Sequence, residues 1–489
     1  MKSFVVILML LIFSFPVPSL ALLPDTDRTL EKQLSPLDKA EKGDPQAQLQ
    51  LGINYEKGDG VEVDFAKAAY WYQKAAEQGY PEAQNNLALL YIKGQGVPKN
   101  YALAMYWLKK AAEKGVAISL NNIGILYENG FGVPKDPKEA SLWYEKAAKK
   151  GGVDGQYNLA ILYMNGLGVP KDISKAIYWY TKAADQGDPD AQNNLGVIYE
   201  RGDGVPRDLN ASIDWYTRAA ENGSVLAQLN LGVLYMDADE SVRNFKKAIY
   251  WFEMAAAQGN VKAQNNLGYL YDQDGEEKNL KKAIYWYTKA AEQGFALAQN
   301  NLGILYSNDD GNTDYSRAFF WFIKSAEQGF ADAQNSLGLL YMKGEGVPVN
   351  YEKALFWYQK AAEQNSALAQ HNLAVMYMKG IGVKKDSQYA VALYKKAAEQ
   401  GLPLAQNNLG VMYMTGEGVP LNMEKAIYWY TQAADQNFYL SQINLGLIYI
   451  EGKGVNKDLS LAKYWIGKAK EGGAKEAYDI WLSHQLWKY

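Results

Sequence analysis

The stretch of residues 405–420, AQNNLGVMYMTGEGVP, occurs in nearly the same form at three other places in the chain. The other copies are AQNNLALLYIKGQGVP from Ala83, AQNNLGVIYERGDGVP from Ala191 and AQNSLGLLYMKGEGVP from Ala333. With its weaker copies, the phrase begins at positions 47, 83, 119, 155, 191, 227, 263, 298, 333, 369, 405 and 441. The spacing is 36 residues, except that it is 35 after positions 263 and 298. A period of this length indicates stacked supersecondary units, none of which buries its apolar face alone.

The first half of each repeat is predicted to be a helix. In the second repeat, Ala83, Leu87 and Tyr91 recur at helical spacing and form one apolar stripe. Gly94 and Gly96 follow them, and glycine adopts the positive φ at which helices often end without a steric cost. The sequence therefore predicts a helix that ends in a glycine turn.

An Asp or Asn stands at one position in the second half of all twelve repeats. Such a side chain accepts hydrogen bonds from the first free N–H groups of a helix, which is worth about 1 kcal/mol per helix. We therefore expect a second helix to begin directly after each of these residues. The predicted N-caps are Asp64, Asn100, Asp136, Asp172, Asp208, Asn244, Asn279, Asp314, Asn350, Asp386, Asn422 and Asp458.

The predicted second helix carries aromatic residues beside alanines, such as Trp71 and Tyr72 with Ala75 and Ala76. Rings set against small residues allow neighbouring helices to pack closely, so we interpret the aromatic pair as core. The expected fold class is therefore an all-α solenoid of about twelve repeats.

The repeat pattern A-x-x-x-L-G-x-x-Y-x-x-G-x-G-V-x-x-D-x-x-K-A-x-x-W-Y-x-K-A-A resembles the Sel1-like repeat, a relative of the tetratricopeptide repeat with a longer loop between its helices. The resemblance covers roughly residues 37–485. It implies a right-handed α/α superhelix that serves as an adaptor or scaffold for protein complexes. For exported bacterial members it also implies envelope maintenance or contact with host proteins. Some members carry cysteine pairs and are associated with penicillin binding, but this chain has no cysteine.

The first residues have the features of a secretory signal. Lys2 precedes an apolar run over residues 4–15, and residues 16–21 end in Ser-Leu-Ala. An uncleaved anchor is the alternative, but the run is short for a membrane span. The predicted organisation is a signal peptide at 1–21, an N-terminal cap at 22–46, twelve repeats at 47–476 and a C-terminal capping helix at 477–489. We expect an exported protein, periplasmic or secreted, with no membrane segment after signal cleavage.

The composition narrows the classes of function. The net charge is −4 and both signs are mixed along the chain, without a Lys/Arg block that nucleic acid would attract. The absence of cysteine excludes disulfides, thiol catalysis and cysteine-based metal sites. We expect no nucleic-acid partner.

Few residues suggest catalysis. The two histidines, His371 and His484, are far apart in the sequence, and His371 stands where many repeats have Asn. Ser460 and Lys463 match the Ser-x-x-Lys spacing of penicillin-binding nucleophiles, but the companion motifs are missing. No phosphate-binding glycine loop is present, so we predict no enzyme and no cofactor. An enzyme acting on cell-wall peptides or β-lactams stays an alternative.

The loops of the sixth to eighth repeats are acidic. Residues 237–240, 272–277 and 308–314 replace the usual Gly-x-Gly-Val turn. Consecutive loops of a solenoid stack along one edge, so these carboxylates are expected to form an acidic strip. Solvated turns, a calcium site and a docking edge for a basic partner are all compatible with this pattern.

A partner-binding groove is predicted on the side of the first helix opposite its apolar stripe. In the second repeat this side comprises positions 82, 85, 89 and 92. Across repeats, position 89 is apolar, either as a groove floor or as packing between repeats. Early repeats carry acidic residues at positions 82 and 92, whereas late repeats carry Leu and Met there, and Met adapts to varied apolar partners. The predicted partner-binding residues are Met342, Leu368, Val375, Met378, Leu404, Val411, Met414, Leu440, Leu447 and Ile450.

Asparagines beside this groove complete the predicted site. Asn372, Asn408 and Asn444 belong to a series that ten repeats share, and an amide both donates to and accepts from the backbone of an extended peptide. An intra-repeat hydrogen bond that holds the loop is the alternative role. The resulting hypothesis is an exported, non-enzymatic adaptor for protein or peptide partners. A eukaryotic lumenal adaptor is the other adaptor hypothesis, for which the sequons at Asn210 and Asn222 would matter.

Overall fold

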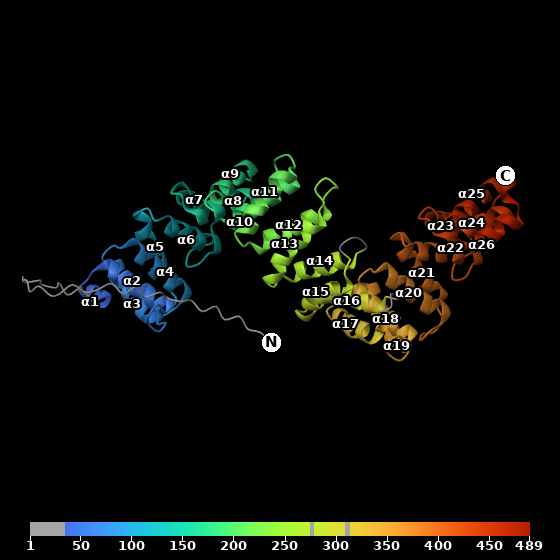
Figure 1. The fold of residues 1–489 in the computed structure, drawn as a ribbon, viewed down its shortest axis with the longest axis horizontal. Helices are drawn as coiled ribbons and strands as arrows, with labels where there is room; N and C mark the ends of the chain where they lie inside the picture. Colours follow the sequence, from blue (N-terminus) through green and yellow to red (C-terminus); the bar gives the residue numbers. More distant parts are fainter. Residues whose placement is uncertain (1–34, 274–277, 309–312) are drawn as a thin grey trace, which may run out of the picture. The chain divides into compact units, whose positions relative to one another are not determined.

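The computed structural model describes residues 35–273, 278–308 and 313–489, and this part is helical with no strand (Figure 1). The chain divides into two compact units, residues 1–186 and 187–489. The predicted signal peptide at 1–21 and much of the predicted cap at 22–46 lie outside the described residues.

The helices of the first unit are α1 (Pro36–Glu41), α2 (Pro45–Lys57), α3 (Phe65–Glu77), α4 (Pro81–Lys93), α5 (Tyr101–Glu113), α6 (Ala117–Asn129), α7 (Pro137–Lys149), α8 (Val153–Asn165) and α9 (Ile173–Ala184). Those of the second unit are α10 (Pro189–Arg201), α11 (Leu209–Glu221), α12 (Val225–Asp237), α13 (Phe245–Ala257), α14 (Val261–Asp272), α15 (Leu280–Glu292), α16 (Ala296–Ser307), α17 (Tyr315–Glu327), α18 (Ala331–Lys343), α19 (Tyr351–Glu363), α20 (Ala367–Lys379), α21 (Ser387–Glu399), α22 (Pro403–Thr415), α23 (Met423–Ala434), α24 (Tyr439–Glu451), α25 (Leu459–Glu471), α26 (Lys475–Ser483) and the 3₁₀ turn η1 (Leu486–Lys488).

Each repeat consists of an even-numbered first helix and an odd-numbered second helix that pack closely on each other. Within each unit, every second helix also packs on the first helix of the next repeat. This serial packing confirms the predicted all-α solenoid. Equivalent positions are named below by their residue in the second repeat, α4 and α5.

All twelve predicted N-caps are confirmed. Asp64, for example, accepts hydrogen bonds through Oδ1 from the N–H groups of Ala66 and Lys67, both at 3.0 Å. The other eleven caps also precede a second helix and accept from its first turn. Because the same local chemistry recurs, the second helices start in register along the chain.

The glycine turn has two separate functions. Gly94 ends α4 in the left-handed conformation, with φ of 70°. A Cβ on Gly96 would lie 2.1 Å from the carbonyl carbon of Phe65, so this glycine allows the loop to contact the preceding repeat. In the sixth to eighth repeats the first helix ends instead at Ala238, Gln273 and Asn308, all in extended backbone. The loss of glycine in these repeats therefore changes how the first helix ends.

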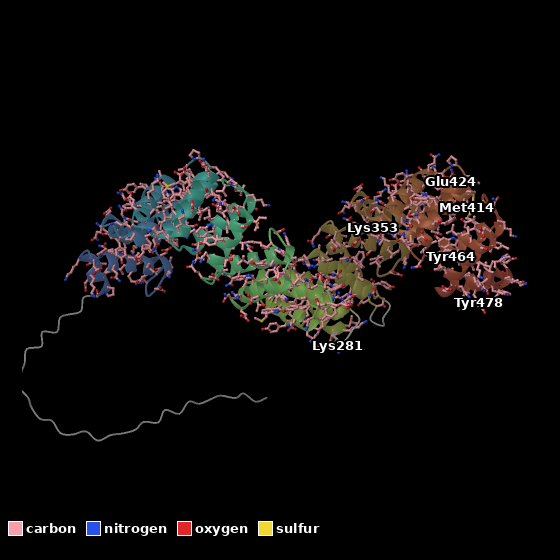
Figure 2. All side chains as sticks on the ribbon, turned by 90° about the horizontal axis from the view of Figure 1, so that it is seen from above. Lys281, Lys353, Met414, Glu424, Tyr464 and Tyr478 are labelled. Carbon is pink, nitrogen blue, oxygen red and sulfur yellow. The ribbon has the colours of Figure 1, made fainter. Side chains whose placement is uncertain are left out.

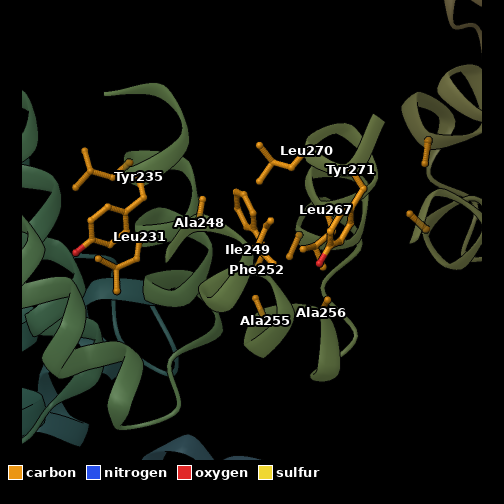
Figure 3. Close-up of a cluster of buried hydrophobic side chains, with 14 of the residues drawn as sticks. Leu231, Tyr235, Ala248, Ile249, Phe252, Ala255, Ala256, Leu267, Leu270 and Tyr271 are labelled. Carbon is orange, nitrogen blue, oxygen red and sulfur yellow. The ribbon is translucent and has the colours of Figure 1, made fainter. Parts of the chain in front are cut away.

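The core of each repeat is a ring or branched side chain packed on a small residue. Tyr72 is fully buried, and a Cβ on Gly52 would approach its ring atoms to 2.4 Å. Figure 3 shows the equivalent Phe252 of α13 between Leu231 of α12 and Leu267 of α14. In most repeats, the glycine of the first helix has no Cβ, and the aromatic side chain of the second helix therefore packs directly against it.

The aromatic prediction is confirmed for the tyrosine and only in part for the tryptophan. Trp71 is half-buried, and the equivalent Trp107 packs against the core of the preceding repeat. The residue before each tryptophan is exposed in many repeats, as with Tyr70, whose ring packs edge-to-face on Trp71 at 5.1 Å. The second helices thus bury one aromatic face and leave another in solvent.

The buried face of the first helix is broader than its apolar stripe suggests. Ala83 and Leu87 are buried as predicted, but Tyr91 is only half-buried. Asn85 is buried, so its predicted place on the groove side is wrong. The physical reason is that a first helix packs against its own second helix and against neighbouring repeats, so polar positions between these contacts are enclosed as well.

A ladder of glutamines joins successive repeats through this enclosed face. Gln264 of α14 donates through Nε2 to the carbonyl oxygen of Ala256 at 3.3 Å, and its Oε1 accepts from Nε2 of Gln293 at 2.7 Å. Gln84 donates in the same way to Ala76, but its Oε1 is one of two buried polar atoms without a partner in the described residues. Lys114 stands where the donor glutamine would be, so the missing bond follows from the sequence.

Candidate partner-binding surface

The first helices form the inner edge of each unit. Among the described helices, α6 contacts α8, α12 contacts α14 and α16 contacts α18, whereas successive second helices make no contact of similar extent. The repeats are therefore closer together at their first helices. This edge carries the residues predicted to bind a partner.

The leucines predicted for this surface are exposed. Leu368 of α20, Leu404 of α22 and Leu440 of α24 are 47%, 42% and 41% exposed. They stand at equivalent positions in three successive first helices. The structure thus places an exposed apolar side chain at the same point of each of these three repeats.

The remaining predicted apolar residues are less accessible. Ile450 is 7% exposed and belongs to a core cluster with Ile466, so it does not offer a binding surface. Its position packs toward the second helix, which is why an apolar residue there is buried in the last repeat. The other predicted residues are half-buried: Met342, Val375, Met378, Val411, Met414 and Leu447.

The methionine position has a defined neighbour in the second helix. Met414 is labelled in Figure 2. Its sulfur lies 3.9 Å from the hydroxyl oxygen of Tyr430. In the first repeat, Glu56 occupies this position and accepts a hydrogen bond from Tyr72 at 2.6 Å. Burial, followed by the bond to Glu56, raises the pKa of Tyr72 above its ordinary value. The early glutamates are therefore partners of buried hydroxyls and not free groove acids.

The asparagines of the predicted site belong to a second ladder. Asn372 donates through Nδ2 to Oδ1 of Asn335 in the preceding repeat at 2.9 Å, and Asn444 donates to Asn407 at 3.2 Å. The same bond joins Asn122 to Asn85 at 3.0 Å. These are bonds between repeats and not within one, so neither a purely peptide-binding nor an intra-repeat role describes them. Each of these asparagines is half-buried, so part of it stays accessible.

His371 replaces asparagine in this ladder. Its Nε2 lies 3.1 Å from Nδ2 of Asn408, and its Nδ1 lies 3.3 Å from Oδ1 of Asn372. Asn408 donates only if Nε2 carries no proton, so the bond requires the neutral ring with its hydrogen on Nδ1. Burial lowers the pKa of His371, while the bond from Nδ1 to Asn372 opposes this shift.

We expect acid to weaken the protein at this junction. The folded pKa of His371 lies below its unfolded value of about 6.5, so its stabilising contribution is complete above that pH and is lost as the pH falls. The loss is about 1 kcal/mol, the usual value of one hydrogen bond. Thermal unfolding of the wild type and His371→Asn between about pH 8 and about pH 5 measures it. The variant restores the amide of the ladder and should lose less stability; equal pH profiles would contradict the assignment.

The inner edge is also apolar and exposed at position 89 in three repeats, which the sequence did not distinguish from the other repeats. Tyr269, Ile304 and Leu339 occupy position 89 in the seventh to ninth repeats and are 44%, 41% and 36% exposed. In the other repeats this position is half-buried, and Val233 and Val411, for example, pack against core clusters. Packing between repeats is therefore the common role of position 89, and exposure is confined to these three repeats.

Residues that suggested other functions have structural roles. Ser460 lies in the first turn of α25, and its N–H donates to Asp458 at 2.9 Å. Asp314 of the acidic loops caps α17, whereas 274–277 and 309–312 lie outside the described residues.

Within the described part of the chain, no three His, Cys, Asp or Glu side chains are grouped as metal ligands. No helix of that part is long and apolar enough to cross a bilayer.

Comparison with known proteins identifies the repeat. A family model described as "Sel1 repeat" matches twelve times, at residues 45–80, 81–116, 117–152, 153–188, 189–224, 225–260, 261–295, 296–330, 331–366, 367–402, 403–438 and 440–473. No curated protein matches the chain.

The chain is similar to two solved structures of repeat proteins. A protective antigen of uropathogenic Escherichia coli strains, with an SLR fold, is 36% identical over 92% of this chain and 96% of its own, with a TM-score of 0.69. A Sel1 repeat protein from Oxalobacter formigenes is also 36% identical, over 44% of this chain and 89% of its own, with a TM-score of 0.42.

Proposed function

This chain belongs to the Sel1 repeat family, and from that membership we propose that it is an exported, non-enzymatic scaffold that binds protein or peptide partners along the inner edge of its late repeats. Solenoids of Sel1 repeats are typical protein-interaction scaffolds. The observation that carries the proposal is the series of exposed leucines on α20, α22 and α24.

These leucines suit an apolar partner because they recur on successive helices. Leu368, Leu404 and Leu440 project from equivalent positions, and half-buried methionines such as Met378 and Met414 lie on the same helices. Methionine adjusts its shape to different apolar groups, so the pairing favours a surface with more than one possible fit. A scaffold already ordered by its ladders loses little conformational freedom on binding.

Export is proposed from the first residues together with one relative. Residues 1–21 have the pattern of a secretory signal. The similar Escherichia coli protein is a protective antigen, and an antigen that protects must be met by the host. Both observations support an envelope or host protein as the partner, with roles in envelope maintenance or host-cell interaction.

The double variant Met378→Glu, Met414→Glu is expected to abolish partner binding and to leave the fold intact. Two carboxylates at an apolar interface lose their hydration on binding, which costs several kcal/mol. The fold tolerates glutamate at this position, since Glu56 and Glu200 accept bonds from Tyr72 and Tyr216 in their own repeats. A cross-linking pull-down with the full chain, from envelope extract and from host-cell lysate, measures the effect.

Met164→Glu is the matched control. Met164 holds the same position in the fourth repeat, outside the proposed surface, and is half-buried like the two late methionines. A protein captured by the wild type and by this control, but not by the double variant, supports the proposal and identifies the compartment. Capture that all three chains share would place the site elsewhere, and no specific capture from either extract would refute the scaffold function.

A further inference from the structure

One position near the end of the first helix packs toward the middle of the second helix. In the first, third and fifth repeats it holds a glutamate that accepts a hydrogen bond from a buried tyrosine, as Glu56 does from Tyr72. In five other repeats the same position holds a methionine: Met164, Met236, Met342, Met378 and Met414. These methionines therefore stand where the fold elsewhere places an oxygen acceptor.

Met414 is in direct contact with the tyrosine of its repeat. Its sulfur lies 3.9 Å from the hydroxyl oxygen of Tyr430, whose side chain is fully buried. Burial raises the pKa of Tyr430, so the hydroxyl keeps its proton and is able to donate. A thioether sulfur is a weak acceptor, whereas a carboxylate is a strong one. The hydroxyl of Tyr430 is therefore bonded more weakly than that of Tyr72.

Oxidation of the thioether to a sulfoxide places an oxygen on this sulfur. The oxygen is a polar acceptor, and an oxygen that stands between the sulfur and the hydroxyl lies within hydrogen-bond distance of Tyr430. Methionine has three rotatable bonds, so an oxygen added on the exposed side of the sulfur is able to turn toward the hydroxyl. The sulfoxide of Met414 would thus take the role that the Glu56 carboxylate has in the first repeat.

The sixth repeat lacks the donor. Met236 holds the same position on α12 and is half-buried, but the residue equivalent to Tyr430 is Phe252, which has no hydroxyl. Met236 and Met414 each pack against a core cluster. A sulfoxide oxygen at Met236 would lose part of its hydration and gain no hydrogen bond from Phe252, which is unfavourable for a polar group. The two repeats therefore differ in the group that a sulfoxide needs.

Met414 is also more accessible than the methionine next to it on the same helix. Met414 is half-buried, whereas Met412, two residues earlier on α22, is 8% exposed and belongs to a core cluster. The tenth repeat has the same arrangement, with Met378 half-buried and Met376 fully buried on α20. Because oxidation follows exposure, an oxidant in solution reacts with Met414 before Met412.

We propose that Met414 is a site of oxidation to the sulfoxide, that the hydroxyl of Tyr430 accommodates the added oxygen, and that this change makes the late surface polar without unfolding its repeat. The inference rests on the proposed scaffold function and adds its regulation. An apolar partner that contacts the methionine would have to strip water from the sulfoxide oxygen in order to stay bound. Release of the partner under oxidising conditions is the expected consequence.

Hydrogen peroxide supplies the oxygen. A lone pair of the sulfur attacks one peroxide oxygen, the O–O bond breaks, and the departing hydroxide takes the proton of the oxygen that is now bound to sulfur. The products are the sulfoxide and water; the sulfur loses two electrons and the peroxide gains them. A dithiol-dependent sulfoxide reductase reverses the change, since two thiols form a disulfide while the oxygen leaves as water.

Peroxide treatment of the full chain, followed by peptide mass spectrometry and hydrogen exchange, tests the site. We expect Met414 to be oxidised several-fold faster than Met412. On oxidation, exchange across α22 and α23 should change little in the wild type but become about tenfold faster in Tyr430→Phe. Circular dichroism of the untreated chains checks that both are folded. Equal oxidation rates of the two methionines, or an equal effect of oxidation on the two chains, would overturn the proposal.

A pull-down measures the effect on the partner. The variant Met342→Leu, Met378→Leu keeps Met414 as its one predicted partner-binding methionine. Adding Met414→Leu gives the matched control, because leucine has a similar volume and is not oxidised. Peroxide should reduce capture by the first chain at least about tenfold and leave the control unchanged, and sulfoxide reductase should restore the capture. An equal loss of capture in both chains would refute the switch.

Failure of this inference is distinguishable from failure of the scaffold function. Capture that persists after Met414 is oxidised would refute the switch and leave the scaffold function in place. No capture by the untreated wild type would refute the scaffold function and the switch with it, while the exchange measurement would still decide whether Tyr430 holds the sulfoxide.

Discussion

Gly232→Ala is expected to destabilise the sixth repeat by about 3 kcal/mol, although alanine is the better helix former. A Cβ at this position would lie 2.3 Å from Cε1 and 2.4 Å from Cδ1 of Phe252. Phe252 is fully buried and lies in one core cluster with Leu231 and Leu267 (Figure 3), so a shift of its ring would disturb its packing against these neighbours. The overpacking cost therefore exceeds the gain in helix propensity, which is about 1 kcal/mol.

A second substitution shows whether the ring is the cause. The second repeat combines Ala88 with Leu108, and both are buried. Phe252→Leu alone should cost about 1 kcal/mol, and added to Gly232→Ala it should recover most of the loss. The two changes then have a coupling energy of about 2 kcal/mol or more. Urea unfolding by circular dichroism measures the total, and hydrogen exchange of peptides from α12 to α14 measures the local effect.

Additive costs in this double-mutant cycle would contradict the interpretation. They would mean that the glycine is needed for the backbone of α12 itself and not for its contact with Phe252. Two other repeats have alanine at the position of Gly232, so alanine is compatible with the fold there. Ala160 and Ala374 face Tyr180 and Tyr394, and in the latter repeat the ring of His371 packs 5.6 Å from that of Tyr394.

The fold was predictable because its signals repeat. The capping side chains and the glycine turns each depend on residues close together in the sequence. These residues recur at the same position from one repeat to the next, so each repeat supports the interpretation of the others. The shortened spacing after positions 263 and 298 was equally visible, and it coincides with helices that end without glycine, at Gln273 and Asn308. Local chemistry of this kind does not depend on the distance between repeats.

The surface was less predictable because exposure depends on neighbouring repeats. Position 89 is apolar throughout, but only the structure shows that Tyr269, Ile304 and Leu339 are exposed and the others are not. Ile450 looks like the late methionines in sequence, yet it is buried beside Ile466. Pairing each buried asparagine with the residue one repeat later shows that Asn300 is paired with Ser336 and not with an asparagine, so the missing hydrogen bond to its Oδ1 within the described residues was predictable from the sequence. The burial of Asn300 was not predictable in this way.

Gln264→Glu is expected to cost about 3 kcal/mol at neutral pH, more than the larger chemical change Gln264→Leu. The glutamine donates to the carbonyl of Ala256 and accepts from Gln293, so its position requires both a donor and an acceptor. A carboxylate keeps the acceptor, loses the donor and places a charge beside a carbonyl oxygen in a buried site. Leucine loses both bonds but buries no charge, and the third repeat uses Leu120, with Lys150 in place of the donor glutamine. We therefore expect Gln264→Leu to cost about 1 kcal/mol.

The pH dependence of the two variants distinguishes the missing donor from a loss of packing. Protonation of the introduced carboxyl restores the donor and removes the charge, so the deficit of Gln264→Glu relative to wild type should shrink as the pH falls toward about 5, whereas the deficit of Gln264→Leu should stay constant. Urea unfolding at a series of pH values, each compared with the wild type at the same pH, measures both. If the two variants were equally stable at neutral pH, the ladder would be a packing feature, and eleven of twelve repeats would hold glutamine here for its shape and not for its two hydrogen bonds. If Gln264→Leu is instead more stable than Gln264→Glu, as we expect, the glutamine position tolerates an apolar side chain but not a charged one. This would explain why the third repeat can carry leucine at this position and still pack against its neighbours.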